Sequence, residues 1–126
     1  MPFPSESGPE SQLGTRPLRV ELDDLAGQTM CVRVTGELDL ATTEELNAQL
    51  TEILTSARTV VLDLGGVTFM DSTGLSAILR AVNRAEMIGA ELKIASPLPS
   101  QPQRLLELTG ILERLAFTAV PPRTPA

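Results

Sequence analysis

The chain has 126 residues, of which 42% are hydrophobic, so it is long enough for one domain and too apolar for a disordered protein. A net charge of −6 and an aromatic content of 2% argue against nucleic acid as a partner, because phosphates attract basic surfaces and bases stack on aromatic rings. The absence of histidine excludes a Ser-His-Asp triad, a Cys-His pair and histidine metal ligands. The only cysteine, Cys31, lies in an apolar run and is predicted to be a small buried side chain.

The sequence also predicts a cytoplasmic protein without direct membrane contact. No apolar stretch approaches the roughly 20 residues that span a bilayer, and residues 1–15 lack the basic start and apolar run of a signal peptide. A single cysteine forms no internal disulfide, which fits a reducing compartment. Nothing in the sequence demands more than a monomer.

Composition divides the chain into three parts. Residues 1–17 are rich in Pro, Ser, Gly and Glu and are predicted to form a disordered arm. Residues 121–126 have a similar composition and are predicted to form a disordered tail. The folded domain is expected to cover residues 18–120.

The folded part begins with two predicted strands. Residues 18–22 alternate between apolar and polar, as in a half-buried strand, and residues 29–35 alternate and are β-branched. Residues 26–28 form the turn that pairs them. Residues 36–39 are expected to break the second strand.

Two helices and a central strand follow. Thr42, with Glu45 three positions later, is typical of a capping box at the start of a helix. Residues 59–64 are nearly continuous in apolar side chains, as in a central strand, and a loop is expected after them. A second helix opens at Asp71 and ends before Gly89. The predicted inner faces of the two helices are Leu46, Leu50, Ile53 and Leu54 in the first, and Leu75, Ile78, Leu79 and Val82 in the second.

The last part completes an α/β pattern. Residues 91–95 are predicted to form a strand, residues 97–102 a proline-rich loop, residues 104–108 the start of a third helix, and residues 117–120 a short final strand. Strands joined through helices imply parallel neighbours. The fold class is therefore α/β, a small mixed β-sheet of four to five strands with helices packed on it.

The segment Asp71-Ser72-Thr73-Gly74 stands where the second helix should begin, and two interpretations of it are open. Asp71 or Ser72 could cap the free N–H groups of the first turn, which is the common use of such residues. Alternatively, Ser72 could receive a phosphate, because a helix N-terminus favours negative charge. A phosphate there would leave the fold intact and repel a partner pressed against it.

Glu37 and Asp39 follow the second predicted strand and could share an edge of the sheet with Ser72. They are interpreted first as loop acids. Paired acids can also perform acid–base chemistry or bind metal, but their spacing specifies neither. An enzyme with Ser72 as nucleophile is disfavoured, because no histidine is present and Lys93, the only lysine, lies in a different strand.

Three segments of the chain resemble the STAS domain, and more narrowly the stand-alone bacterial anti-sigma factor antagonists. They are Gly36-Glu37-Leu38-Asp39, Val61-Leu62-Asp63-Leu64 and the nine residues 67–75, VTFMDSTGL. The resemblance covers roughly residues 18–120. It implies a protein that binds an anti-sigma factor, itself a serine kinase, and thereby releases a sigma factor.

The resemblance also implies how such a protein is controlled. The kinase phosphorylates the serine after the motif's aspartate, here Ser72, and a serine phosphatase reverses the modification. Nucleotide chemistry belongs to the kinase, so no cofactor is expected on this chain. Helical spacing places Ser76 and Arg80 one and two turns beyond Ser72, and we expect them to form a mostly polar docking patch with Glu37 and Asp39. The predicted partner-binding residues are Glu37, Asp39, Asp71, Ser72, Thr73, Gly74, Ser76 and Arg80.

An alternative within the same fold is a non-phosphorylated STAS component of a membrane transport system. The phosphoacceptor sequence and the lack of an attached membrane segment in this sequence argue against it. A neighbouring gene for an anti-sigma kinase would favour the first function, and neighbouring transporter genes would favour the second.

Overall fold

The computed structural model describes residues 18–123 and shows a mixed five-stranded sheet with helices on it, which confirms the predicted α/β class. The strands are β1 (Arg19–Leu25), β2 (Thr29–Leu38), β3 (Thr59–Met70), β4 (Glu91–Ser96) and β5 (Ala116–Ala119). The helices are α2 (Thr43–Leu54), α3 (Ser72–Ile88), α4 (Ser100–Thr109) and the short 3-10 helix η1 (Leu112–Arg114). The predicted N-terminal arm lies outside the described residues.

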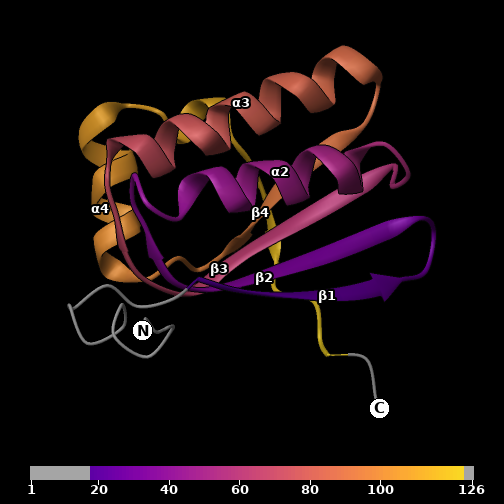
Figure 1. Cartoon of the computed structure of the whole chain (residues 1–126), viewed down its shortest axis with the longest axis horizontal. Helices are drawn as coiled ribbons and strands as arrows, with labels where there is room; N and C mark the ends of the chain where they lie inside the picture. The colour runs from indigo at the N-terminus through magenta and orange to yellow at the C-terminus, as the bar shows by residue number, and fades with distance from the viewer. Residues whose placement is uncertain (1–17, 124–126) are drawn as a thin grey trace, which may run out of the picture.

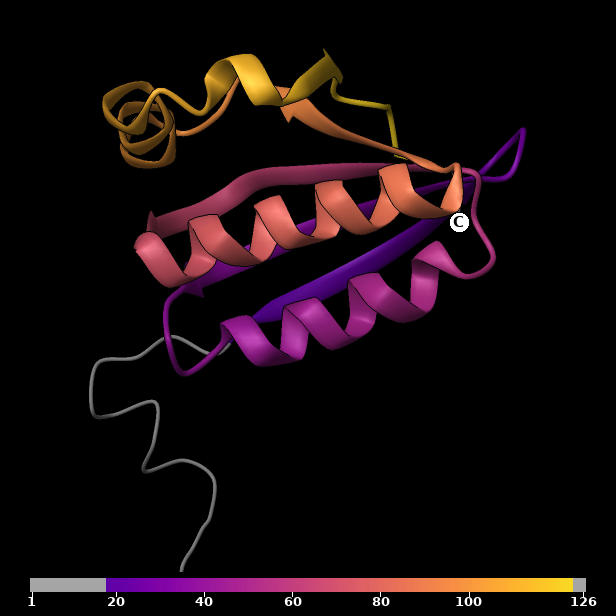
Figure 2. The ribbon, with the colours of Figure 1, turned by 90° about the horizontal axis from the view of Figure 1, so that it is seen from above.

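The strands follow their sequence order across the sheet. β1 pairs with β2 in antiparallel fashion, and every later pair is parallel. Helices α2 and α3 run side by side over one face of the sheet, and α4 lies at the end of the sheet where α3 begins (Figures 1 and 2). Because parallel strands end at the same edge, α2 and α3 both begin at the carboxyl edge of β2 and β3. Within residues 18–123, no helix is both long and apolar enough to cross a membrane.

The main core is aliphatic and lies between the sheet and the helices. Alternate residues of the strands point into it, as the period of two demands, among them Val32, Val34, Val60, Leu62 and Leu64. The predicted inner faces of α2 and α3 are confirmed, and their innermost side chains Leu46, Leu50 and Ile78 are at most 1% exposed.

Strands β2 and β3 are longer than the sequence predicted. The break expected at Gly36 is instead an irregularity within β2: Gly36 has a φ of 120° and the register with β3 shifts on either side of it. The loop expected after Leu64 is also wrong, because β3 continues to Met70. A side chain at Gly66 would lie 2.7 Å from the Thr35 hydroxyl, so glycine lets the two backbones stay close here.

Helix α4 begins four residues earlier than predicted, at Ser100. Pro102, expected in a loop, is buried within its first turn. The first-turn N–H groups of a helix have no partner inside the helix, so a proline costs no hydrogen bond there. The loop predicted over residues 97–102 is therefore confirmed for residues 97–99 and wrong for residues 100–102, which belong to α4.

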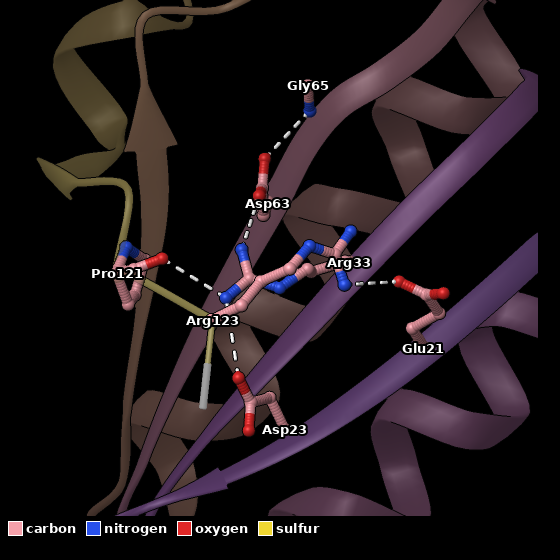
Figure 3. A network of polar contacts seen from close by, with 7 residues as sticks. All are labelled: Glu21, Asp23, Arg33, Asp63, Gly65, Pro121 and Arg123. Atoms are coloured by element: carbon pink, nitrogen blue, oxygen red, sulfur yellow. Dashed lines mark hydrogen bonds and ion pairs between the residues drawn. The ribbon is translucent and has the colours of Figure 1, made fainter. Parts of the chain in front are cut away.

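The opposite face of the sheet carries a buried cation between two acids (Figure 3). Arg33 donates from Nη1 to an oxygen of Asp63 at 2.9 Å, and its Nη2 lies 3.5 Å from an oxygen of Asp23. The same Nη2 donates to the carbonyl of Pro121 at 3.1 Å, and Arg123 pairs with Glu21. Residues 121–123, assigned to the tail from sequence, therefore lie against this face.

Cys31 lies on the same face and is completely buried beside Val61 and Ala95, as the sequence predicted for a small apolar side chain. Burial raises the pKa of its thiol more than the nearby Arg33 guanidinium lowers it.

We expect Arg33→Met to lower the free energy of unfolding by about 3–5 kcal/mol, because it removes the guanidinium that lies between two largely buried carboxylates. Urea denaturation measures this change. Arg123→Met is the matched control, since the pair of Arg123 with Glu21 is exposed and its loss should cost less than about 1 kcal/mol. Equal small losses in both variants would show that the Arg33 network contributes little.

Candidate functional site

Two segments that are distant in the sequence meet at the carboxyl edge of β2 and β3. Leu38, the last residue of β2, is paired in register with Met70, the last residue of β3. The pairing continues one residue further, because the Asp71 N–H donates to the Leu38 carbonyl at 3.1 Å. The turn before α2 and the first turn of α3 are thus placed next to each other.

Asp71, and not Ser72, caps helix α3. Its Oδ1 accepts hydrogen bonds from the N–H groups of Thr73 at 2.9 Å and Gly74 at 3.2 Å, and from the Thr73 hydroxyl. Ser72 is the first residue of the helix and is exposed. Within residues 18–123, no hydrogen bond engages its hydroxyl. Of the two interpretations left open by the sequence, capping therefore falls to Asp71, and the Ser72 hydroxyl remains available.

The cap also determines the charge of this helix start. Partial burial acts to raise the pKa of the Asp71 carboxyl, but the Thr73 hydroxyl and the backbone N–H groups of Gly74 and Thr73 outweigh it. The net effect lowers the pKa of Asp71 below its ordinary value of 3.8. A fixed negative charge therefore stands directly beside Ser72 at neutral pH.

Gly74 brings the start of α3 into contact with the end of β2. A Cβ added to Gly74 would lie 2.8 Å from the Leu38 carbonyl oxygen and 2.9 Å from the Leu38 Cβ, both too close for a real side chain, and 3.0 Å from Cγ of Met70. The glycine is buried, and its role is close approach, since its φ lies outside the left-handed region. Gly74 thus acts on a partner surface only by placing its neighbours.

The start of α2 differs from the predicted capping box. The Thr42 hydroxyl makes no capping bond to the helix; it donates to the Glu37 carbonyl at 2.6 Å and accepts from the Asp39 N–H at 3.1 Å. The Asp39 carboxylate instead accepts from the N–H groups of Ala41 and Thr42. The prediction was wrong because the tight turn after β2 directs the threonine hydroxyl back to the strand. Glu37, expected in a loop, lies inside β2 and is half-buried.

A shallow hollow of about 330 Å³ lies between the starts of α2 and α3. Its lining residues are Leu40, Thr43, Glu44, Ser72, Thr73, Ser76 and Arg80. Ser72, Ser76 and Arg80 follow each other at four-residue spacing, so they share one face of α3, as the sequence predicted. Arg80 forms no ion pair within residues 18–123, so its charge is available to another molecule.

The structure brings together only part of the predicted docking patch. Ser72, Thr73, Ser76 and Arg80 line the hollow. Asp39, Asp71, Gly74 and Glu37 do not line it: the Asp39 carboxylate bonds within the turn before α2, Asp71 caps α3, Gly74 is buried and Glu37 belongs to β2.

Sequence reasoning missed three residues of the hollow, Leu40, Thr43 and Glu44. Leu40 is an apolar side chain that is 77% exposed, and Glu44 lies in the first turn of α2. A leucine between Asp39 and Ala41, outside the apolar pattern of strand and helix, is the signal that could have identified the first. No signal in the sequence places Glu44 near Ser72, because the two residues meet only through the pairing of β2 with β3.

The fold and this edge can be compared with known proteins. The STAS domain family matches residues 20–121. An anti-sigma F factor antagonist from Paenibacillus polymyxa is 31% identical over 98 residues, which cover 76% of this chain and 82% of the relative. The chain therefore belongs to the STAS domain family, as its three segments predicted.

Two solved structures share the fold. An anti-sigma factor antagonist from Mycobacterium paratuberculosis aligns with a TM-score of 0.72 at 21% identity, covering 82% of this chain and 86% of the other. The Bacillus cell fate determinant SpoIIAA in its phosphorylated form aligns with a TM-score of 0.62 at 19% identity, covering 80% of this chain and 92% of its own.

We expect Asp71→Ala to lower the free energy of unfolding by about 1 kcal/mol through loss of the cap, and Asp71→Asn to retain most of it. Because folding lowers the pKa of Asp71, its contribution is present above the ordinary carboxyl pKa and is lost as the pH falls through the folded value. Urea denaturation between pH 7 and pH 3 measures both effects. The stability difference between wild type and Asp71→Asn should shrink or change sign toward pH 3; a pH-independent difference would contradict the assignment.

Proposed function

We propose that this protein is an anti-sigma factor antagonist that is switched by phosphorylation of Ser72. In its unmodified form it binds an anti-sigma factor that is also a serine kinase, and this binding frees a sigma factor. The kinase transfers a phosphate from ATP to the Ser72 hydroxyl, and the modified protein releases the kinase. A serine phosphatase restores the binding form.

One observation carries this proposal: the first residue of α3 is an exposed serine whose hydroxyl is not needed for the helix. Asp71 satisfies the first-turn N–H groups of Thr73 and Gly74. Modification of Ser72 therefore removes no hydrogen bond on which the fold depends. The membership of the STAS family and the 31% identical antagonist support the same function.

The helix start suits a phosphate on physical grounds. A phosphoserine carries about −1.5 to −2 charges at neutral pH, and the positive end of the dipole of a 17-residue helix partly offsets them. SpoIIAA, which shares this fold, has a phosphorylated form. We therefore expect the phosphorylated protein to keep its structure.

Partner binding, in contrast, is sensitive to the new charge. The phosphate would stand beside the ionised Asp71 at the rim of the hollow. A partner that covers the hollow would have to remove water from this cluster of negative charge, which is costly without a paired cation. The switch thus acts on the contact between two proteins and leaves the architecture of this one unchanged.

The hollow indicates what the partner surface must supply. Leu40 offers an exposed apolar side chain on one side, and Arg80, which has no ion pair among residues 18–123, offers a cation on the other. A complementary surface has an apolar recess for Leu40 and a carboxylate for Arg80. A polar rim with one apolar anchor is typical of reversible interfaces.

Substitutions of Ser72 test the switch. Ser72→Ala should bind the anti-sigma kinase like wild type and resist release by ATP, while Ser72→Asp should weaken binding at least about tenfold, or ~1.4 kcal/mol. Neither should change the melting temperature appreciably, because Asp71 remains as the cap. Isothermal titration with purified anti-sigma factor kinases of the source organism measures the affinities.

Mass spectrometry after incubation with the kinase and ATP locates the phosphate. Ser76→Ala is the matched control, since it removes a second exposed hydroxyl from the same hollow and should still be phosphorylated and released. Phosphate on Ser76 or Thr73, or none at all, would refute the assignment to Ser72.

Charge reversal tests the docking surface. Arg80→Glu should weaken kinase binding by about tenfold or more, because it places a carboxylate opposite the carboxylate expected on the partner. Arg84→Glu is the control, since Arg84 is exposed one turn further along α3 and does not line the hollow. Equal affinities of the two variants would remove Arg80 from the interface.

A further inference from the structure

A side chain of α4 holds the backbone immediately before the proposed phosphorylation site. Gln101 accepts a hydrogen bond from the Met70 N–H at Oε1, 2.8 Å away, and donates from Nε2 to the Met70 carbonyl at 2.9 Å. One side-chain amide thereby satisfies both polar backbone groups of a single residue. Met70 is the last residue of β3, two positions before Ser72.

These two hydrogen bonds take the place of strand pairing, because β4 does not extend alongside the end of β3. β3 pairs with β4 only as far as Leu62 and Ile94. Beyond that point, α4 packs against β3, and the Gln101 amide meets the Met70 backbone as a neighbouring strand would. On its other side, Met70 is paired in register with Leu38 of β2.

The anchor is rigid on the α4 side. Pro102 and Leu106 of the helix are buried, and Leu106 is only 1% exposed, so α4 is fixed to the core. The Met70 side chain is fully buried and lies against Gly74 of α3. The direction in which the chain leaves β3 is therefore held by α4, β2 and α3 together, and Ser72, itself exposed, takes its orientation from them.

We propose that Gln101 is a positioning residue for Ser72: its amide holds Met70, and so sets the geometry in which the Ser72 hydroxyl meets the γ-phosphate of ATP on the kinase. This inference rests on the proposed function. In the transfer, the Ser72 oxygen forms a bond to the γ-phosphorus, the bond from that phosphorus to the bridging oxygen of ADP breaks, and the hydroxyl proton passes to a base of the kinase. Such in-line transfer depends on position, and a misplacement of about 1 Å can cost up to about 100-fold in rate.

The test compares two glutamines of the same helix. Gln101→Met removes both bonds to Met70 at nearly constant volume. Gln103→Met makes the same chemical change where the amide bonds only to the exposed Glu107 carboxylate. Each variant serves as substrate for the purified anti-sigma factor kinase with ATP, and kcat and KM for phosphorylation of Ser72 are measured separately.

The separation of kcat from KM distinguishes positioning from damage to the fold. A partly unfolded substrate lowers the concentration of competent protein and raises the apparent KM, while kcat at saturation stays the same. We expect Gln101→Met to lower kcat at least about fivefold with KM within about twofold, and Gln103→Met to behave like wild type. A kcat for Gln101→Met equal to that of wild type, or a change in KM alone, would overturn the proposal.

Two further measurements test the role of Gln101 without relying on the kinetics of Gln101→Met alone. Gln101→Glu retains the acceptor for the Met70 N–H and loses the donor, so its kcat should lie between those of wild type and Gln101→Met. Hydrogen exchange of the Met70 amide should accelerate in Gln101→Met and not in Gln103→Met; unchanged exchange would overturn the proposed anchoring.

The failure of this inference and that of the proposed function look different. If wild type is phosphorylated on Ser72 and Gln101→Met is phosphorylated with equal kcat, only the positioning role of Gln101 fails. If wild type is phosphorylated by none of the kinases of the source organism, the switch at Ser72 fails and the role of Gln101 falls with it.

Discussion

The pairing of Leu38 with Met70 at the ends of β2 and β3 is the constraint on which the functional edge depends. It places the turn before α2 against the first turn of α3, and the Asp71 N–H extends it by one more hydrogen bond to Leu38. Gly74 permits the close contact that follows, because no side chain fits between it and the Leu38 backbone. Without this pairing, the starts of α2 and α3 would not lie next to each other, and the hollow between them would not form.

At this helix start, the residue that caps the helix differs from the residue proposed to be modified. The Asp71 carboxylate satisfies the free N–H groups, and the neighbouring Ser72 is left exposed. An acid with a lowered pKa therefore performs the structural task, while an uncharged hydroxyl is available for chemistry. A charge added to that hydroxyl changes what the surface can bind and leaves the bonds within the protein in place.

The two faces of the sheet are stabilised differently. Helices α2 and α3 bury one face in an aliphatic core, whereas the other face holds Arg33 between Asp23 and Asp63 under the chain at Pro121. The polar network lies on the face away from α2 and α3, so the proposed phosphorylation site and the crossing of residues 121–123 occupy different surfaces. A partner that binds the helix starts, as we propose, would leave the contact that holds residues 121–123 in place.

The sequence by itself determined the order of the main strands and helices, the aliphatic core and the serine at the start of α3, because these follow from periodicity and from residues adjacent in the chain. The predictions from sequence were wrong where contacts with a distant segment of the chain determine the local structure. The Thr42 hydroxyl bonds to the Glu37 carbonyl of β2, and β3 continues to Met70 because it pairs with β2. The Gln101 amide bonds to the Met70 backbone, from a helix that begins earlier than the proline pattern predicted. Only the tertiary structure decided which side chains line the hollow and which serve as caps, since strand pairing and helix packing join residues about 30 positions apart, and local sequence patterns carry no record of those contacts.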